Sequence, residues 1–186
     1  IYRIKRKKGD RFMKNKVLDG IMGLCVGDAL GVPVEFMKRE ELKRNPVIDM
    51  RSDGTYNLPA GSWSDDSSMA LALLDSLKNG LNYRDIMEKF AEWFEKGKYA
   101  PYGECFDIGI GTRKAIYRYW DGIDPLECGG DSEFDNGNGS LMRILPILFY
   151  LCDKYKEITF SEEAMDIIHN ISSLTHKHKR SMIACG

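Results

Sequence analysis

Apolar residues recur at helical spacing along almost the whole chain, and no stretch shows sustained alternation of apolar and polar residues. Residues three and four positions apart share one face of a helix, whereas a strand places every second residue on one face. The pattern predicts helices over residues 16–30, 67–77, 84–96, 112–120, 141–155, from 161 onward and 179–186. Loops are expected over residues 34–63, 97–108 and 121–138. We therefore predict an all-α protein.

Two of these segments, residues 67–77 and 141–155, are apolar on nearly every side. Helices of this kind are buried by neighbours on more than one face, so we expect both at the centre of the fold. Pro146 lies near the start of the second segment, where its missing N–H costs little, or else it kinks the helix.

A length of 186 residues suits one domain with a sizeable core. Residues 1–12 are expected to be a non-native or disordered tail, because they are crowded with Lys and Arg and begin at Ile1 rather than at a methionine. Residues 13–186 are assigned to a single domain.

The formal net charge of −1 gives the chain no overall bias toward nucleic acid or anionic lipid, so neither partner is expected. We identify no signal peptide and no apolar run long enough to span a bilayer, and predict no membrane partner. The five cysteines are scattered without a C-x-x-C pair, which argues against a disulfide framework or a zinc ribbon. These features predict a protein of the reducing cytoplasm.

The sequence W-S-D-D-S-S-M at residues 63–69 precedes one of the central helices. Ser64 or Asp65 can cap that helix, because a side-chain oxygen there accepts from the first free amides. A cap needs one oxygen, whereas Asp65 and Asp66 with hydroxyls on both sides supply several. Hard cations such as Mg²⁺ take oxygen ligands and are usually held by one or two carboxylates plus water. From this motif alone, two interpretations stay open: a helix cap without a metal, or a metal site.

Two further acids lie at unusual places. Asp28 is on the last turn of an apolar helix, where negative charge is unfavourable unless something pairs with it. Glu35 follows shortly after that helix, between Pro33, Val34 and Phe36. An apolar setting tends to raise the pKa of a carboxyl group, which suits general acid or base catalysis. The alternative is an ordinary exposed loop acid.

A glycine-rich turn, G-N-G at residues 137–139, precedes the second central segment. Glycine lets backbone amides approach a ligand closely, and a helix N-terminus attracts phosphate or hydroxyl-rich groups. The turn is not a Walker loop, because no G-K-S/T follows. His176, in T-H-K-H between two predicted helices, is by itself a surface or capping residue rather than evidence for a zinc site.

These segments occur in one order, and in that order the sequence resembles the ADP-ribosylglycohydrolase family. The family includes dinitrogenase-reductase-activating glycohydrolases and ADP-ribosyl-acceptor hydrolases. The matching stretches are GLCVGDALGVPVEF, GSWSDDSSMALAL, FDIGIGTRKAI, GNGSLMRILPI and SLTHKH, which together cover about residues 16–186. W-S-D-D combined with G-N-G-S-L-M-R makes the resemblance highly specific. It implies a compact, orthogonal multi-helix all-α domain.

The resemblance also implies a hydrolase that cleaves the N- or O-glycosidic bond of ADP-ribosylated proteins or small molecules. Two Mg²⁺ ions, or Mn²⁺, would lie in a central cleft, with Ser64, Asp65 and Asp66 as metal ligands. Glu35, Asp65 and Asp66 are the candidate catalytic carboxylates, and the choice of the general base among them stays open. The substrate-binding positions implied are Asp107, Gly137, Asn138, Gly139, Ser140 and His176.

Two departures from the family pattern matter. Ser64 stands where the family more often has threonine, which keeps the oxygen. Family members also run well beyond this core and carry a late D-x-D-T/S motif that completes both metal sites, and no such motif occurs here. We therefore expect the N-terminal portion of a domain truncated on its C-terminal side, inactive alone, which self-associates through apolar helix faces left open.

Other hypotheses stay open at this stage. One is a catalytically silent family member with a structural or binding role, as in crystallins that resemble the family. The adjacent carboxylates argue against it, because a structural role does not need them. Another is a gene fragment without activity. The acceptor group, whether arginine, serine or another, is not specified by the sequence.

Overall fold

The computed structural model describes the backbone of residues 11–156 and 161–186, and side chains from residue 16 onward in those ranges. Within them every regular element is a helix, and the only extended pairing is two isolated bridges, Asp53–Leu58 and Gly130–His176. The α-helices are α1 (Arg11–Gly31), α2 (Arg39–Arg44), α3 (Asp65–Leu77), α4 (Tyr83–Lys96), α5 (Ile110–Trp120), α6 (Leu145–Tyr155), α7 (Glu162–Ser173) and α8 (Lys179–Cys185). Short 3₁₀ helices are η1 (Val32–Val34), η2 (Gly54–Tyr56) and η3 (Pro125–Glu127). The all-α prediction is confirmed.

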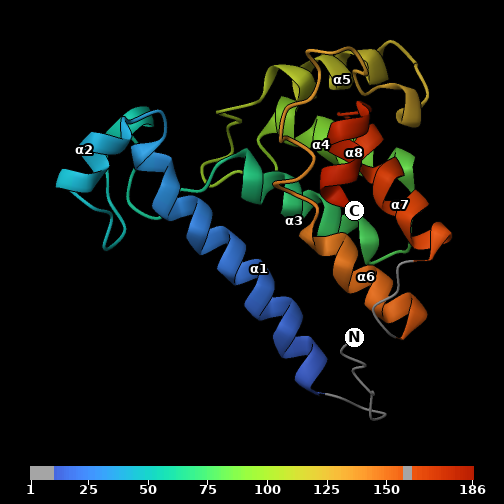
Figure 1. Ribbon diagram of the computed structural model, residues 1–186, viewed down its shortest axis with the longest axis horizontal. Helices are drawn as coiled ribbons and strands as arrows, with labels where there is room; N and C mark the ends of the chain where they lie inside the picture. The colour runs from blue at the N-terminus through green and yellow to red at the C-terminus, as the bar shows by residue number, and fades with distance from the viewer. Residues whose placement is uncertain (1–10, 157–160) are drawn as a thin grey trace.

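Helix α3 lies at the centre of this arrangement (Figure 1). It packs against α1, α4 and α6, and nine of its 13 residues are buried. Met69, Leu73 and Leu77 belong to the hydrophobic core that α3 shares with α4, α6 and α7. Its central position was predicted from its near-continuous apolar character and is confirmed.

Helix α6 differs from its prediction in both start and burial. It begins at Leu145 rather than at residue 141, because Pro146 occupies the first turn, where a missing N–H is harmless. Only Pro146, Ile147 and Leu151 are buried in it, and Leu148 is exposed. Helix α6 packs against both α3 and α1, as expected for a helix with neighbours on more than one face, but in the described part of the chain it is less buried than its apolar sequence predicts.

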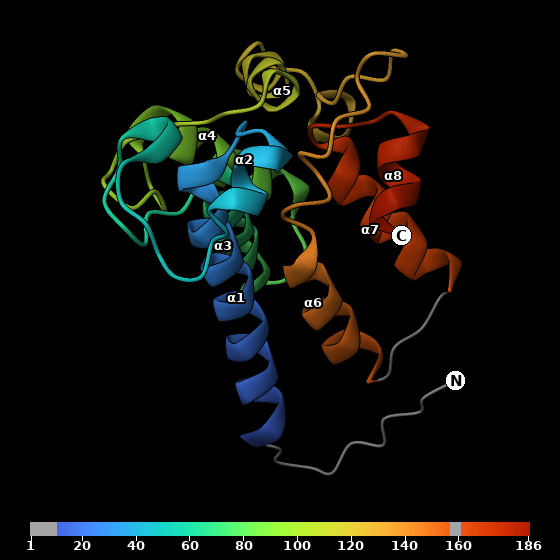
Figure 2. The same cartoon turned by 60° about the vertical axis from the view of Figure 1, so that its left-hand side comes forward.

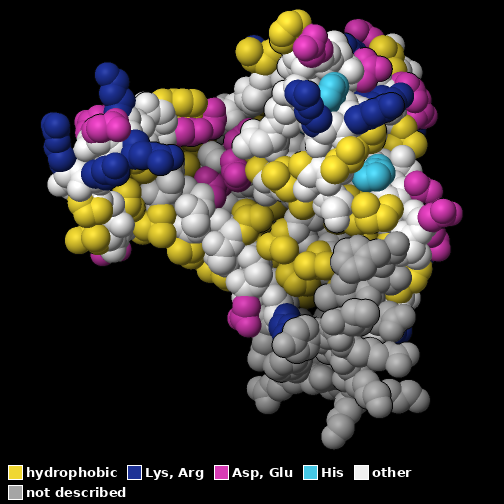
Figure 3. Space-filling view, viewed as in Figure 1, with side chains coloured by type: hydrophobic (Ala, Val, Ile, Leu, Met, Phe, Trp, Pro, Cys, Tyr) yellow, Lys and Arg dark blue, Asp and Glu magenta, His cyan; other side chains and the backbone are white. Residues whose placement is uncertain are grey.

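Helix α1 runs along the edge of the molecule, with α2 beyond its C-terminal end (Figures 1 and 2). It begins at Arg11, inside the tail predicted over residues 1–12, and residues 1–10 of that tail lie outside the described residues. Leu18, Met22 and Val26 are exposed along it, and Figure 3 shows hydrophobic side chains on this side of the molecule. Self-association through such a face stays a prediction.

By length and composition, the segment Lys16–Val34 is apolar enough to cross a membrane. This corrects the sequence-based statement that no apolar run has that length. In the structure the segment packs against α3 and α6, and its Asp28 accepts hydrogen bonds from the start of α3. These are the contacts of a helix that packs within the fold of the chain.

Two predicted boundaries need correction. The sequence predicts a loop over residues 34–63, but this segment contains α2 and η2. Helix α2 is favoured because acidic residues in its first turn and basic residues in its last turn complement the helix dipole. The sequence predicts a helix that starts at residue 112, where Thr112 would be the cap, but α5 begins at Ile110 with Gly109 at the N-cap position. The Thr112 side chain is buried inside the helix instead.

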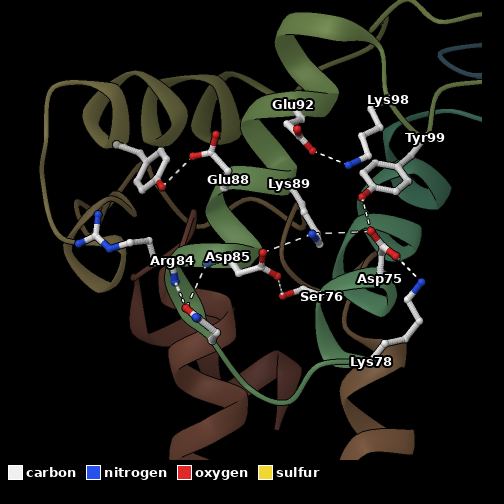
Figure 4. Close-up of polar contacts among 12 residues, drawn as sticks. Asp75, Ser76, Lys78, Arg84, Asp85, Glu88, Lys89, Glu92, Lys98 and Tyr99 are labelled. Carbon is white, nitrogen blue, oxygen red and sulfur yellow. Dashed lines mark hydrogen bonds and ion pairs between the residues drawn. The ribbon is translucent and has the colours of Figure 1, made fainter.

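A polar network ties the loop after α4 to α3 and α4 (Figure 4). The Tyr99 hydroxyl donates to Asp75 on α3 at 2.7 Å, and Lys89 on α4 pairs with both Asp75 and Asp85. The indole N–H of Trp63 donates to the carbonyl of Tyr99 at 3.0 Å. The network fixes the first half of loop 97–108, whose second half carries Asp107.

Candidate active site

The C-terminal end of α1 meets the N-terminal end of α3 through Asp28. Its carboxylate accepts from the backbone N–H groups of Ser64 and Ser67, both at 3.0 Å. It also accepts from their hydroxyls, at 2.7 and 2.6 Å. A negative charge that is unfavourable at the end of its own helix is therefore stabilised by the positive end of another helix. This contact supplies the partner that the sequence required for Asp28.

Ser64 caps α3, since its side chain accepts from the backbone N–H of Asp66. The predicted capping role is confirmed. Asp65 and Asp66 follow in the first turn, and Asp66 lines a cavity of about 330 Å³ together with Asp28, Glu35 and Ser64. Figure 3 shows acidic side chains gathered in the notch between the α2 segment and the helical body. The fold therefore brings the predicted metal and catalytic residues together.

The electrostatics of this acidic site follow from burial and crowding. Burial, together with the charges of the neighbouring Asp107, Asp66 and Asp28 carboxylates, raises the pKa of Asp65 to about 8. Burial is also the largest cause that raises the pKa of Asp66, followed by the charge of Asp28. The pKa of Glu35 is raised by burial and then by Asp107. Burial and the charges of neighbouring acids make these three carboxyl groups harder to ionise, so a bound cation would be favoured here.

The donor set fits a hard cation in kind, because carboxylate and hydroxyl oxygens line the cavity. Among the described residues, however, no group of three or more Asp, Glu, His or Cys side chains is arranged to hold a metal ion. The Ser64 hydroxyl is also engaged, since it donates to Asp28 and accepts from the Asp66 amide. The described residues therefore suit an ion held by one or two carboxylates and water, a common arrangement for Mg²⁺.

Asp107 joins the acidic site from a different part of the chain. It has a left-handed backbone, with φ of 52°, and its carboxyl interacts with Glu35 and with the Tyr56 hydroxyl. Burial and these acceptor carboxylates raise the pKa of Tyr56. Sequence reasoning missed Tyr56, because nothing in its local pattern shows that it lies beside two acids.

The glycine-rich turn forms a second group, around His176. A Cβ added to Gly139 would lie 2.6 Å from the imidazole, and one on Gly111 would lie 3.1 Å from it. Gly137 and Asn138 are exposed, whereas Ser140 is buried and accepts from Ser172 at 2.8 Å. His176 is only 6% exposed. It therefore supports the turn from beneath, which is not the surface position that T-H-K-H indicates by itself.

A buried hydroxyl opens onto this second group. Thr112 Oγ1 is buried without a hydrogen-bond partner among the described residues, and a Cβ on Gly139 would come within 3.3 Å of it. The first turn of α5 has no side-chain cap. The uncapped amides of α5 and the glycine-rich turn can receive an oxygen-rich ligand such as a phosphate, while the Thr112 hydroxyl lies buried beside them.

Arg143 lies between the two groups and is completely buried. Its guanidinium donates to the carbonyls of Gly139 and Ile171 and lies 4.8 Å from the centre of the Phe90 ring. Burial lowers its pKa to about 10, while the charges of Cys185 and Asp65 act in the opposite direction. Arg143 thus connects the glycine-rich turn, through its hydrogen bond to Gly139, with Asp65, through the interaction of their charges.

The buried imidazole makes the stability of the protein sensitive to acid. Burial and the charge of Arg143 lower the pKa of His176 to about 4, against a weak opposing effect of Asp135. A base with a lowered folded pKa stabilises the fold above its unfolded pKa of 6.5, and that stability is lost as the pH falls toward 4. The gap corresponds to a loss of about 3 kcal/mol at most. We expect His176→Asn to remove this part of the acid sensitivity.

The measurement is urea unfolding of both proteins between pH 7 and pH 4.5. The acidic site shifts stability in the opposite direction, but does so in both proteins, so their difference isolates His176. His178→Asn is the matched control, because His178 caps α8 and asparagine is also a good cap; it should keep the wild-type dependence. A His176→Asn protein that loses as much stability as wild type on acidification would contradict the assignment.

The sequence matches the ADP-ribosylglycohydrolase family over residues 10–186. ADP-ribosylarginine hydrolase Tri1 of Pseudomonas putida (strain GB-1) is 35% identical over 139 residues, which cover 70% of this chain and 34% of that protein. ADP-ribosyl-(dinitrogen reductase) glycohydrolase of Rhodospirillum rubrum is 39% identical over 136 residues, 71% of this chain and 43% of that protein. A solved ADP-ribosylglycohydrolase-related protein complex superimposes with a TM-score of 0.73 at 29% identity, over 93% of this chain and 53% of that one. The chain thus spans about a third to a half of the length of these relatives.

Proposed function

Since this chain belongs to the ADP-ribosylglycohydrolase family, we propose that the protein hydrolyses the bond between ADP-ribose and an acceptor group, with Mg²⁺ at the start of α3. The observation that carries the proposal is the acidic site itself. Asp28, Glu35, Asp65, Asp66 and Asp107 come from three separate segments and converge, although crowding and burial raise the pKa values of Glu35, Asp65 and Asp66. A fold that only needed a capped helix would not require this concentration of negative charge.

In this proposal Asp65 and Asp66, with the Ser64 oxygen, hold the metal, and Mn²⁺ can replace Mg²⁺. A bound divalent cation would bind sugar hydroxyls and stabilise charge that develops at the glycosidic carbon. Glu35 lies at the wall of the same cavity, and its raised pKa suits a group that accepts a proton from the attacking water. Asp28 orients the first turn of α3, which carries both aspartates, and Asp66 lines the cavity.

The glycine-rich turn is proposed to receive the pyrophosphate and ribose portion of the substrate. Gly137, Asn138 and Gly139 supply backbone amides, the buried Ser140 anchors the turn through its hydrogen bond with Ser172, and His176 supports the turn from below. Two relatives carry the name ADP-ribosylarginine hydrolase, so an ADP-ribosylated arginine side chain on a protein is the first acceptor to test.

The proposal predicts that substitution of the α3 aspartates abolishes both metal binding and turnover. Asp66→Asn keeps the shape of the side chain but removes a charge that a cation needs, and we expect at least a roughly 100-fold loss of ADP-ribose release. Mg²⁺ binding by calorimetry should weaken in parallel. Asp131→Asn, at an exposed position, is the matched control and should leave both unchanged.

These measurements are made on the natural gene product that contains this sequence. They also separate the proposed hydrolase from a catalytically silent family member. A protein that binds Mg²⁺ through Asp66 but releases no ADP-ribose from any ADP-ribosylated arginine or serine would favour the silent alternative. Full turnover by Asp66→Asn would show that the metal lies elsewhere.

A further inference from the structure

Three segments distant in sequence meet at Tyr56. Helix η2, which ends at Tyr56, presses against η1: a Cβ on Gly54 would lie 2.1 Å from the carbonyl oxygen of Pro33. The Thr55 hydroxyl donates to the carbonyl of Glu35 at 2.6 Å. On its other side the Tyr56 ring packs on Phe106, with centroids 5.4 Å apart. The ring is thus placed between the residues that carry Glu35 and Asp107.

This placement brings the Tyr56 hydroxyl close to two acids. The hydroxyl lies within interaction range of the carboxyl groups of both Glu35 and Asp107, which raise its pKa, and these two acids also interact with each other. These contacts bring the two acids together from segments about 70 residues apart in the chain. Tyr56 is therefore in direct contact with one proposed catalytic residue and one proposed substrate residue.

The backbone around the three residues is held in unfavourable conformations. Left-handed φ angles occur at Phe36, directly after Glu35, at Asn57, directly after Tyr56, and at Asp107 itself, with values of 61°, 54° and 52°. Such conformations persist only where surrounding contacts enforce them, and they cluster at functional sites. The contacts that can enforce them here are those of η2 and the Tyr56 side chain.

We propose that Tyr56 is a positioning residue, which sets the separation of Glu35 and Asp107 at the edge of the acidic site. The inference rests on the proposed function for its catalytic consequence, but its structural content is independent of that function. Without the hydroxyl, the Glu35 and Asp107 segments lose their common partner and move independently.

The first test is amide hydrogen exchange of the unliganded protein, read by mass spectrometry. Tyr56→Phe keeps the ring on Phe106 and removes only the hydroxyl. Exchange should accelerate roughly 10- to 100-fold in peptides that contain residues 34–37 and 106–108, as expected for a lost hydrogen bond to a charged group. Tyr119→Phe is the matched control, since that hydroxyl donates to Glu88 at 3.0 Å, outside the acidic site; it should leave both segments unchanged.

Asp107→Asn provides a second variant, because asparagine tolerates a left-handed backbone. This variant alters Asp107 rather than Tyr56 or the Glu35 segment. It should nevertheless accelerate amide exchange at residues 34–37. If both variants are folded and neither changes exchange at residues 34–37, the proposal is overturned. The same holds if Tyr56→Phe accelerates exchange equally throughout the chain, since the effect would then be global.

The second test measures ADP-ribose release. Tyr56→Phe should lower kcat roughly 10-fold or more and leave KM within about twofold, because a displaced Glu35 affects the chemical step more than ground-state binding. In Glu35→Gln the further substitution of Tyr56 should have little effect, as expected for two residues that act as a unit. If wild type releases no ADP-ribose, the proposed function fails, and the exchange measurement alone decides the role of Tyr56.

Discussion

Arg143→Met is expected to destabilise the protein by roughly 2–4 kcal/mol, although it removes a charge from a site that water does not reach. Arg143 is 0% exposed, and its guanidinium donates to the carbonyls of Gly139 and Ile171. Methionine fills a similar volume but leaves both carbonyls without a donor, at a cost of roughly 1–3 kcal/mol each. The contact with the face of Phe90 contributes about a further 1 kcal/mol.

One effect opposes these losses. A buried guanidinium pays for its desolvation, and its replacement by an apolar side chain has stabilised other proteins. In Arg143 the charge is delocalised, hydrogen-bonded and placed over an aromatic ring, and the negative charge of Asp65 acts on it. We therefore expect the lost contacts to exceed the relieved desolvation.

The measurement is urea unfolding of Arg143→Met against Arg113→Met, an exposed position on α5. The control should remain within about 0.5 kcal/mol of wild type. Arg143→Lys should also be destabilised, because one ammonium cannot reproduce the two-directional guanidinium contacts. An Arg143→Met protein as stable as wild type would mean that desolvation outweighs all the contacts described here.

Much of the fold could be predicted from the spacing of apolar residues. The helix after Asn82 and the helix after Ser161 form as predicted, because each has a capping side chain before an amphipathic stretch. The errors arose where a local signal was ambiguous. Thr112 resembles a cap but is buried, and residues 141–144 continue the apolar pattern of α6 although the helix begins beside Pro146.

The residues of the candidate site likewise differ in how far the sequence alone predicts them. Asp65, Asp66 and the glycine-rich turn stand in short motifs that the sequence displays directly. Tyr56 and Arg143 matter because of contacts with residues far away in the chain, and no local pattern reports such contacts. Asp28 is intermediate: its unfavourable position at a helix end indicated that it must have a partner, but not that the partner is the start of α3.

That contact leads to the other large effect. Asp28→Asn is expected to destabilise the protein by roughly 3–5 kcal/mol, and to lower any activity that depends on the first turn of α3. The carboxylate accepts four hydrogen bonds, from the amides and hydroxyls of Ser64 and Ser67. An asparagine amide has only one acceptor oxygen, so at best it keeps the three bonds that Oδ2 accepts, while its NH₂ group forces the Ser64 hydroxyl to give up its role as donor to Asp28 and disturbs its capping contact with the Asp66 amide. The charge that stabilises the start of α3 is lost as well.

Asp19→Asn is the matched control, because Asp19 is exposed on the same helix, and it should change unfolding by less than about 0.5 kcal/mol. Ser67→Ala tests the same contact from α3, where the serine is completely buried. If the hydrogen bonds to Asp28 carry the effect, the double variant Asp28→Asn with Ser67→Ala is less destabilised than the sum of the single variants, by roughly 1–3 kcal/mol. Strict additivity would show that the two residues stabilise the protein separately, and that the start of α3 does not depend on Asp28 for its position.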